Sequence, residues 1–307
     1  MAFQPSIIMK HNLLFTAFLC FTSCLSAQIT SLVLDSMDHQ PVPYINIWVV
    51  QEGLGTSSDE NGRFSLPAFG PKHALVFNAL GYKPKTLLFS EFRDTIYLVP
   101  QSIELAEVII APRKRTTIRS TGSYKKAGIN YYLGAGNRKP CIFARYFPYE
   151  PLYMETPFLQ TVKVLTNSDI RRAVFNIRLY SVAPDGTPQD YLYDKNILGV
   201  ARKGKTFTEI DLSKLNICIP KQGLVVAVEW LLIESNKYEY RYTEKGSKKK
   251  KTGFTYCPSL GTIPNETNEN SWFYAGGKWN RVLKNSGPVE KYWGKYNLLA
   301  MELVLSD

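Results

Sequence analysis

The stretch that decides the fold class is residues 29–66, ITSLVLDSMDHQPVPYINIWVVQEGLGTSSDENGRFSL. Two runs in it, 29–34 and 44–50, are rich in β-branched and aromatic residues and predict short strands. Asp59-Glu60-Asn61-Gly62 predicts a tight turn before the next strand, because Asn-Gly accepts the positive φ that such turns need. Similar runs continue to residue 99 without a helical period. The pattern predicts a small antiparallel β-sandwich.

Four phrases of the sequence occur in the order of a known domain family. They are Pro41-Val42-Pro43-Tyr44-Ile45-Asn46-Ile47, Gly55-Thr56-Ser57-Ser58-Asp59-Glu60-Asn61-Gly62-Arg63-Phe64-Ser65-Leu66, Leu80-Gly81-Tyr82 and Leu105-Ala106-Glu107-Val108-Ile109-Ile110. Together they resemble the carboxypeptidase regulatory-like domain, a transthyretin-like β-sandwich widespread in Bacteroidetes envelope proteins. One departure is Ser31, where family members often have glycine. The resemblance implies such a sandwich over residues 28–112.

The resemblance is to an accessory sandwich and does not imply peptidase chemistry. A zinc peptidase needs several histidine and carboxylate ligands around one metal. Beyond residue 27 the chain has only His39 and His73, and neither belongs to a His-x-x-Glu or His-Glu-x-x-His pattern. We therefore expect no metal site, no cofactor and no metallocarboxypeptidase activity.

The first 27 residues have the order of a secretory signal. Lys10 precedes the apolar run 13–21, and Leu25-Ser26-Ala27 supplies a small-residue exit, so we expect cleavage after Ala27. The run is far below the ~18 residues that span a bilayer. Lipidation at Cys24 is the alternative, although Phe21 stands where a lipoprotein signal has an aliphatic residue. The prediction is an exported protein, in the periplasm or at the outer membrane or cell surface, with no transmembrane span in the mature chain.

Three cysteines remain after export, Cys141, Cys218 and Cys257. No two of them have the spacing of metal ligands, and an odd number allows at most one disulfide. A bridge between Cys218 and Cys257 is left open by the sequence.

The formal charge of +11 is concentrated in clusters. Charge runs of this kind usually mark solvated loops, and we expect 245–251 to be a basic hairpin tip or loop. In an exported chain, the partner that such positive charge would attract is an anionic surface polymer rather than nucleic acid. The clusters are Arg113-Lys114-Arg115, Lys125-Lys126, Arg202-Lys203-Gly204-Lys205 and Lys248-Lys249-Lys250-Lys251.

The rest of the chain predicts a basic linker over 113–140 and a second, jelly-roll-like β-sandwich over 141–307. Residues 172–180 alternate, with Phe175, Ile177 and Leu179 on one side and Asn176 and Arg178 on the other, as in a half-buried strand. The nearly continuous apolar run 224–233 predicts a central strand covered on both faces. Within that run Glu229 needs a partner, either across the core or in a site. Phrases in this half resemble the uncharacterised C-terminal domains found beside the regulatory-like domain, which implies no activity.

Four aromatic residues of this second domain are candidate ligand-binding residues: Trp272, Tyr274, Trp279 and Trp293. Flat rings beside polar groups suit stacking on a sugar. Rings of this size more often fill a sandwich core, so core packing is the first expectation and a glycan site the second.

No catalytic residue is nominated, because the sequence has no Gly-x-Ser-x-Gly elbow, no phosphate-binding loop and few histidines. The sequence predicts a non-catalytic, exported envelope protein that acts as a binding or scaffold module for a glycan or an envelope protein partner. Two alternatives remain. One is a cryptic polysaccharide hydrolase with a carboxylate pair in the C-terminal domain. The other, implied by the resemblance, is an accessory protein of a TonB-dependent outer-membrane transporter.

Overall fold

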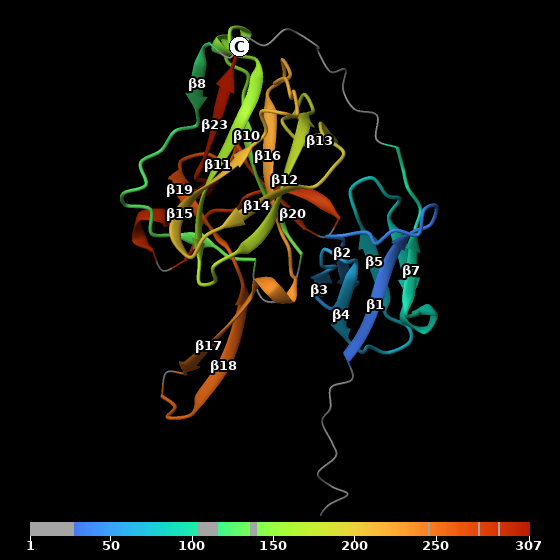
Figure 1. Ribbon diagram of the computed structural model, residues 1–307. Helices are drawn as coiled ribbons and strands as arrows, with labels where there is room; N and C mark the ends of the chain where they lie inside the picture. Colours follow the sequence, from blue (N-terminus) through green and yellow to red (C-terminus); the bar gives the residue numbers. More distant parts are fainter. Residues whose placement is uncertain (1–27, 103–115, 136–139, 245, 276, 288) are drawn as a thin grey trace, which may run out of the picture.

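Two β-sandwiches make up the described part of the computed structural model (Figure 1). The structure describes residues 28–102, 116–135, 140–244, 246–275, 277–287 and 289–307. Within these ranges there are strands and short 3-10 helices but no α-helix, which confirms the all-β fold class. No helix in this part of the chain has the length and apolarity to cross a membrane. The predicted signal peptide, the phrase 105–110 and Lys245 lie outside the described residues.

The first sandwich packs a three-stranded sheet against a four-stranded sheet. Ile45, Ile47, Leu75, Phe77 and Leu98 are fully buried between the sheets. Strand pairs are antiparallel except for β1 with β7. The three-stranded sheet has the order β4 (Arg63–Pro67), β1 (Gln28–Asp35), β7 (Thr95–Leu98). The four-stranded sheet has the order β3 (Leu54–Ser57), β2 (Asn46–Val49), β5 (Ala74–Asn78), β6 (Lys85–Leu88).

The tight turn expected before β4 is present. Gly62 has a φ of 73°, and its N–H donates to the Asp59 carbonyl at 3.1 Å. A Cβ at Gly62 would lie 2.6 Å from the Val33 carbonyl oxygen, so glycine is required both for the backbone conformation and for the close approach of β1.

The second sandwich consists of two seven-stranded antiparallel sheets around the larger hydrophobic core. We name its sheets by their central strands. The β16 sheet has the order β13 (Pro188–Tyr191), β12 (Ala173–Val182), β16 (Leu224–Trp230), β10 (Ile142–Phe147), β20 (Ser271–Ala275), β21 (Lys278–Arg281), with β14 (Ile197–Ala201) also on β12. The β11 sheet has the order β22 (Tyr296–Leu299), β19 (Ser259–Asn265), β11 (Phe158–Ser168), β23 (Met301–Ser306), β8 (Ile118–Thr121), with β15 (Gly204–Asp211) on β11 and β9 (Tyr132–Leu133) on β19. Its jelly-roll character stays a prediction.

Part of the segment expected as a linker lies in the second sandwich. β8 pairs with β23, and β9 pairs with β19. Both strands fall within 113–140, so the described residues 116–135 contribute to the β11 sheet. The short strands form because distant strands supply their hydrogen-bond partners, a signal that local sequence does not contain.

The two strands with the clearest patterns behave as their sequences predict, with one difference. β16 lies between β12 and β10 and is buried along its whole length. On β12, Phe175, Ile177 and Leu179 join the main core, while Asn176 and Arg178 lie on the opposite face. That opposite face is buried too, since Asn176 and Arg178 are 0 % and 4 % exposed. The strand is therefore covered on both sides rather than half-buried.

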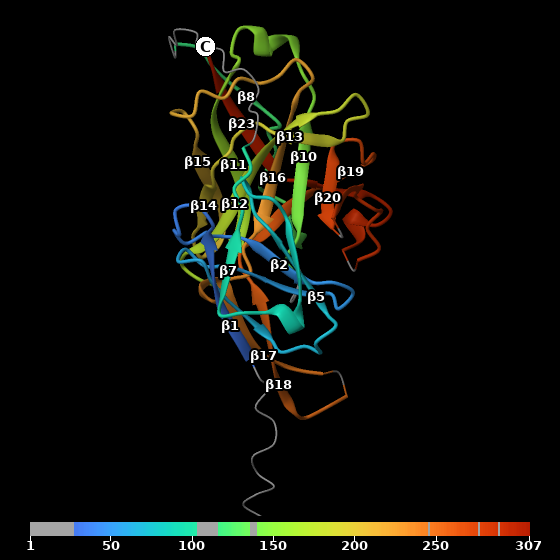
Figure 2. The same ribbon diagram turned by 90° about the vertical axis from the view of Figure 1, so that its right-hand side faces the viewer.

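A separate two-stranded ribbon, β17 (Lys237–Thr243) and β18 (Lys250–Tyr256), projects from the second sandwich. Figures 1 and 2 show it extending past the lower ends of both sandwiches. Lys248 and Lys249 lie in its turn, and Lys250 and Lys251 begin β18, as expected for a basic hairpin tip. Four 3-10 helices are described: η2 (Phe89–Glu91), η3 (Pro151–Met154), η4 (Glu234–Asn236) and η5 (Glu290–Tyr292).

The three cysteines form no disulfide in the structure, and the bridge left open between Cys218 and Cys257 is not made.

Candidate ligand-binding cleft

A cleft of about 580 Å³ lies between the two sandwiches. Its floor is the outer face of the β16 sheet, the face turned away from the main core. Its opposite wall comes from β2 and from the loops around Gln51 and Asn78 of the first sandwich. We call it the interdomain cleft. The side chains that matter below are Asn46, Arg178, Tyr180, Tyr191, Glu229, Tyr274 and Trp279.

Strand register gathers residues far apart in sequence on this one face. Asn176 is opposite Glu229, Glu229 opposite Ile142, Ile142 opposite Tyr274, and Tyr274 opposite Trp279. Directly paired residues of neighbouring strands point to the same side of a sheet. A single row across five strands therefore runs from a polar end at Asn176 and Glu229 to an aromatic end at Tyr274 and Trp279.

A buried ion pair forms the polar end of the cleft. Nε and Nη2 of Arg178 each lie 2.7 Å from Oε2 of Glu229, whose side chain is 6 % exposed. Asn46 of the first sandwich donates its amide to Oε1 of the same carboxylate. Burial is the largest single influence on the pKa of Arg178 and lowers it, but the charge and hydrogen bond of Glu229 together with Tyr191 and Tyr180 outweigh burial, so the pKa is raised. The partner that Glu229 required is thus Arg178, and the pair lies on the cleft face rather than in the main core.

Hydrogen-bonding groups on this face are left unused. Nη1 of Arg178, Oδ1 of Asn176 and Nε1 of Trp272 are buried, and none has a hydrogen-bond partner among the described residues. Most buried polar groups in proteins do have partners. Of the three residues only Arg178 lines the cleft, so its Nη1 is the unused donor that a polar ligand there could meet.

Aromatic rings form the other end. Tyr180 contacts Tyr191 at a centroid distance of 4.7 Å and Trp279 at 5.3 Å, and Trp279 contacts Tyr274 at 5.3 Å. Burial raises the pKa of Tyr180, Tyr191 and Tyr274, so their hydroxyls stay protonated across the physiological range. The rings present apolar surface and neutral hydroxyl groups together, as in pockets for small polar molecules.

The structure brings two of the four candidate residues together. Tyr274 and Trp279 are in contact and line the cleft. Trp272 lies one row away, 6 % exposed and covered by the Arg281 guanidinium at 3.7 Å from its ring centroid. Trp293 follows η5, is 67 % exposed and lies outside the cleft.

Other cleft residues were not among the sequence-based candidates. The alternation of β12 had already placed Arg178 opposite the core residues, and the same two-residue period reaches Tyr180. Asn46 had no such signal, because it belongs to the other sandwich and lies 183 residues from Glu229 in the chain.

The cleft offers little catalytic chemistry. Glu229 is its one carboxylate among the described lining residues, so the pair that a glycosidase needs is not found in that part of the chain. Burial raises the pKa of Cys141 to about 12, which keeps this lining thiol protonated and a poor nucleophile. No group of three or more His, Cys, Asp or Glu side chains in the described ranges is arranged to hold a metal ion.

Comparison with known proteins finds a similarity for the first sandwich. Residues 29–110 match the model of the CarboxypepD_reg-like domain, a non-catalytic regulatory fold. One similar solved structure contains the cysteine protease and lectin-like domains of Cwp84, a surface layer associated protein of Clostridium difficile. That likeness has 9 % identity and a TM-score of 0.36, and it covers 91 % of this chain and 58 % of that one. No curated protein matches the chain.

Proposed function

We propose that this chain is an exported, non-catalytic envelope protein that binds carbohydrate in the interdomain cleft. The observation that carries the proposal is the contact of Tyr274 with Trp279 on the same sheet face as the Arg178–Glu229 pair. Export is supported by the secretory pattern of residues 1–27.

Carbohydrate is the ligand class that fits both ends of the cleft. A sugar ring has an apolar face of C–H groups, which stacks on aromatic rings, and a rim of hydroxyl groups. The unused Nη1 of Arg178 can donate to a hydroxyl or carbonyl oxygen, and the side chains of Asn46 and Gln189 add amide groups to the lining. Because Glu229 neutralises Arg178, the polar end carries no net charge, which favours a neutral sugar over an anion.

The binding test compares two tryptophans of the same domain. A glycan array is probed with the chain from Gln28 onward and with the Trp279→Ala and Trp293→Ala variants. Losing a large contact ring from a binding site costs on the order of 2 kcal/mol, about thirtyfold in Kd. We expect Trp279→Ala to lose binding by that factor and the exposed Trp293→Ala, outside the cleft, to keep it.

Two outcomes would contradict the proposal: the absence of any neutral glycan ligand, and equal binding by both variants. Thermal unfolding of each variant separates loss of the site from loss of the fold. Titration of the glycan found on the array with an Arg178→Lys variant then reports on the polar end. We expect weaker binding, because the donors of lysine are all on one nitrogen and cannot reproduce the planar fork by which Nε and Nη2 of Arg178 hold Glu229 while Nη1 stays unused.

A further inference from the structure

The projecting ribbon of β17 and β18 carries an aromatic stripe. Tyr238, Tyr240 and Tyr242 alternate along β17 and therefore share one face. Their ring centroids are 6.5 Å and 6.0 Å apart in sequence order. Tyr238 packs against the main core, whereas Tyr240 and Tyr242 are 41 % and 40 % exposed. The stripe thus runs from the body of the second sandwich out along the ribbon.

Gly253 allows the ring of Tyr240 to lie close against the partner strand. It is the residue directly opposite Tyr240 on β18, and a Cβ there would lie 2.9–3.1 Å from three atoms at the outer end of the tyrosine side chain. Only a residue without a side chain lets the ring lie this close to the partner strand. One side of the ring is thereby covered by the ribbon, and its exposed area faces solvent.

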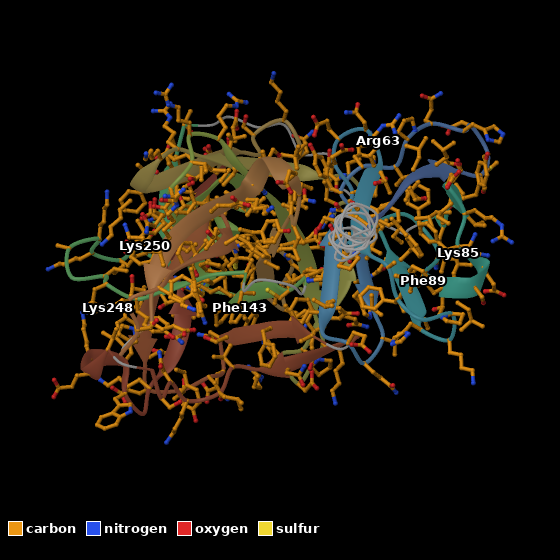
Figure 3. All side chains as sticks on the ribbon, turned by 90° about the horizontal axis from the view of Figure 1, so that it is seen from below. Arg63, Lys85, Phe89, Phe143, Lys248 and Lys250 are labelled. Atoms are coloured by element: carbon orange, nitrogen blue, oxygen red, sulfur yellow. The ribbon has the colours of Figure 1, made fainter. Side chains whose placement is uncertain are left out.

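The same ribbon carries a large share of the positive charge of the protein. Residues 237–251 contain seven lysines and arginines against two glutamates, a net charge of +5, out of +11 for the whole chain. Lys251 is paired with Glu244 at 2.6 Å, and Lys237 lies near Glu234 and Glu239. Lys248, Lys249 and Lys250 make no ion pair with any carboxylate that the structure describes. Seen from below, Lys248 and Lys250 lie on the side of the molecule away from Lys85 and Phe89 of the first sandwich (Figure 3).

We propose that this ribbon is a second binding site, separate from the interdomain cleft, for an acidic polysaccharide whose sugar rings carry carboxylates. Tyr240 and Tyr242 stack on successive rings, and the lysines of the turn contact the carboxylates. The two contributions are complementary, because stacking needs flat exposed rings and the lysines need a polyanion.

The other residues of the ribbon favour a polysaccharide over other polyanions. Glu239 and Thr252 are exposed on the opposite face and can bond to sugar hydroxyl groups. A lipid surface fits less well, because a membrane-binding element inserts an apolar face, whereas the two exposed rings of the stripe, Tyr240 and Tyr242, carry hydroxyl groups.

The test measures binding of polygalacturonate to the chain from Gln28 onward by isothermal titration. The variants are Tyr240→Ala/Tyr242→Ala and a quadruple Lys→Gln change at 248–251. Tyr97→Ala is the aromatic control, because Tyr97 is also a strand tyrosine with 41 % exposure but belongs to the first sandwich. Arg202→Gln/Lys203→Gln is the charge control, at another basic turn.

We expect both ribbon variants to lose about tenfold or more in affinity and both controls to bind like the parent chain. Affinity of the parent chain should fall as salt is raised, and this dependence should be weaker in the Lys→Gln variant. Tyr240→Phe/Tyr242→Phe should restore binding, since stacking needs the ring and not the hydroxyl.

Three results would overturn the proposal. They are no binding of polygalacturonate by the parent chain, unchanged binding by the double alanine variant, and tighter binding of a poly-dT oligonucleotide or a phosphatidylglycerol vesicle than of polygalacturonate. Neutral dextran should not bind the ribbon. The Trp279→Ala variant distinguishes the two sites, because it leaves the ribbon intact. It should lose binding of neutral glycans and keep binding of polygalacturonate.

Discussion

Glu229 and Arg178 are two charged residues on the sheet face that forms the floor of the cleft. Both side chains are almost completely buried, and two hydrogen bonds of 2.7 Å hold them together. Such a pair gains little net stability, because desolvation offsets the attraction, but removing one partner leaves an uncompensated buried charge. The pair therefore fixes the geometry of the cleft floor more than it stabilises the fold.

Removing one member of this pair should destabilise the folded protein. We expect Glu229→Gln to lower the free energy of unfolding by about 3–5 kcal/mol, because Arg178 then stays buried without a counter-charge. An Arg178→Met/Glu229→Leu double variant should recover most of the loss. Urea unfolding at 25 °C measures both, and a cost below about 1 kcal/mol for Glu229→Gln would mean that water reaches the pair.

For single residues, the sequence predicted which face of a strand a side chain occupies better than it predicted which residues that side chain contacts. The two-residue period of β12 separated Arg178 from the core residues, and the apolar surroundings of Glu229 showed that it needs a partner. Neither signal identifies Asn46, because its contact with Glu229 depends on how two domains meet. The aromatic candidates illustrate the same limit: Tyr274 and Trp279 meet because β20 pairs with β21, while Trp293 lies on another segment.

Among the elements, β14 shows how tightly the second sandwich is packed. Gly199 of β14 lies directly opposite Phe175 of β12, and the phenyl ring fills the space over the glycine. A Cβ there would be 2.4 Å from the ring, closer than real atoms approach. The glycine is thus part of the core packing, although its strand is at the edge of the β16 sheet.

We expect Gly199→Ala to lower the free energy of unfolding by about 1–3 kcal/mol, as overpacking in a filled core does. Leu198→Ala on the same strand is the matched control, since Leu198 is 40 % exposed and its truncation should stay within about 0.5 kcal/mol. Thermal or urea unfolding distinguishes the two. Equal effects of the two substitutions would show that Phe175 moves aside without cost.

Strands with strong side-chain patterns were predictable, and strands defined by their partners were not. β16 and β12 have long apolar or alternating runs. β8 has the sequence IRST and is mostly exposed, and β9 has two residues. Their strand conformation comes from hydrogen bonds to β23 and β19, far along the chain, so composition predicted a linker there.

In the whole molecule, the two sandwiches are joined through polar contacts at the end of β16. The Ser57 N–H donates to the Leu232 carbonyl at 3.2 Å, the Leu232 N–H donates to Oγ of Ser57 at 3.0 Å, and the Thr56 hydroxyl donates to the same carbonyl at 3.1 Å. Glu229, three residues before Leu232, bonds to Asn46. The cleft floor therefore uses β16, and the domain contact uses both β16 and the residues that directly follow it. Sequence patterns that describe each domain alone do not contain this contact.

We expect an Asn46→Ala/Ser57→Ala variant to weaken the joint between the sandwiches. Calorimetry should then show a separate unfolding transition of the first sandwich at lower temperature. Small-angle scattering should show a larger radius of gyration. Ser65→Ala is the control, because the Ser65 hydroxyl bonds to the Ile29 carbonyl within the first sandwich. A scattering curve unchanged from that of the parent chain would contradict the role assigned to these contacts.

The pairing of β8 with β23 has a consequence for the order in which the chain folds. The described strands of the first sandwich lie between residues 28 and 98, so these strands are present early in synthesis. The β11 sheet, by contrast, joins residues 118–121 to residues 303–306, and loops of such length are slow to close. During translation the described strands of the first sandwich can pair with one another before β23 of the second sandwich has been synthesised. The second sandwich is then the slower-folding part, and the one whose unpaired edges are exposed longest to aggregation.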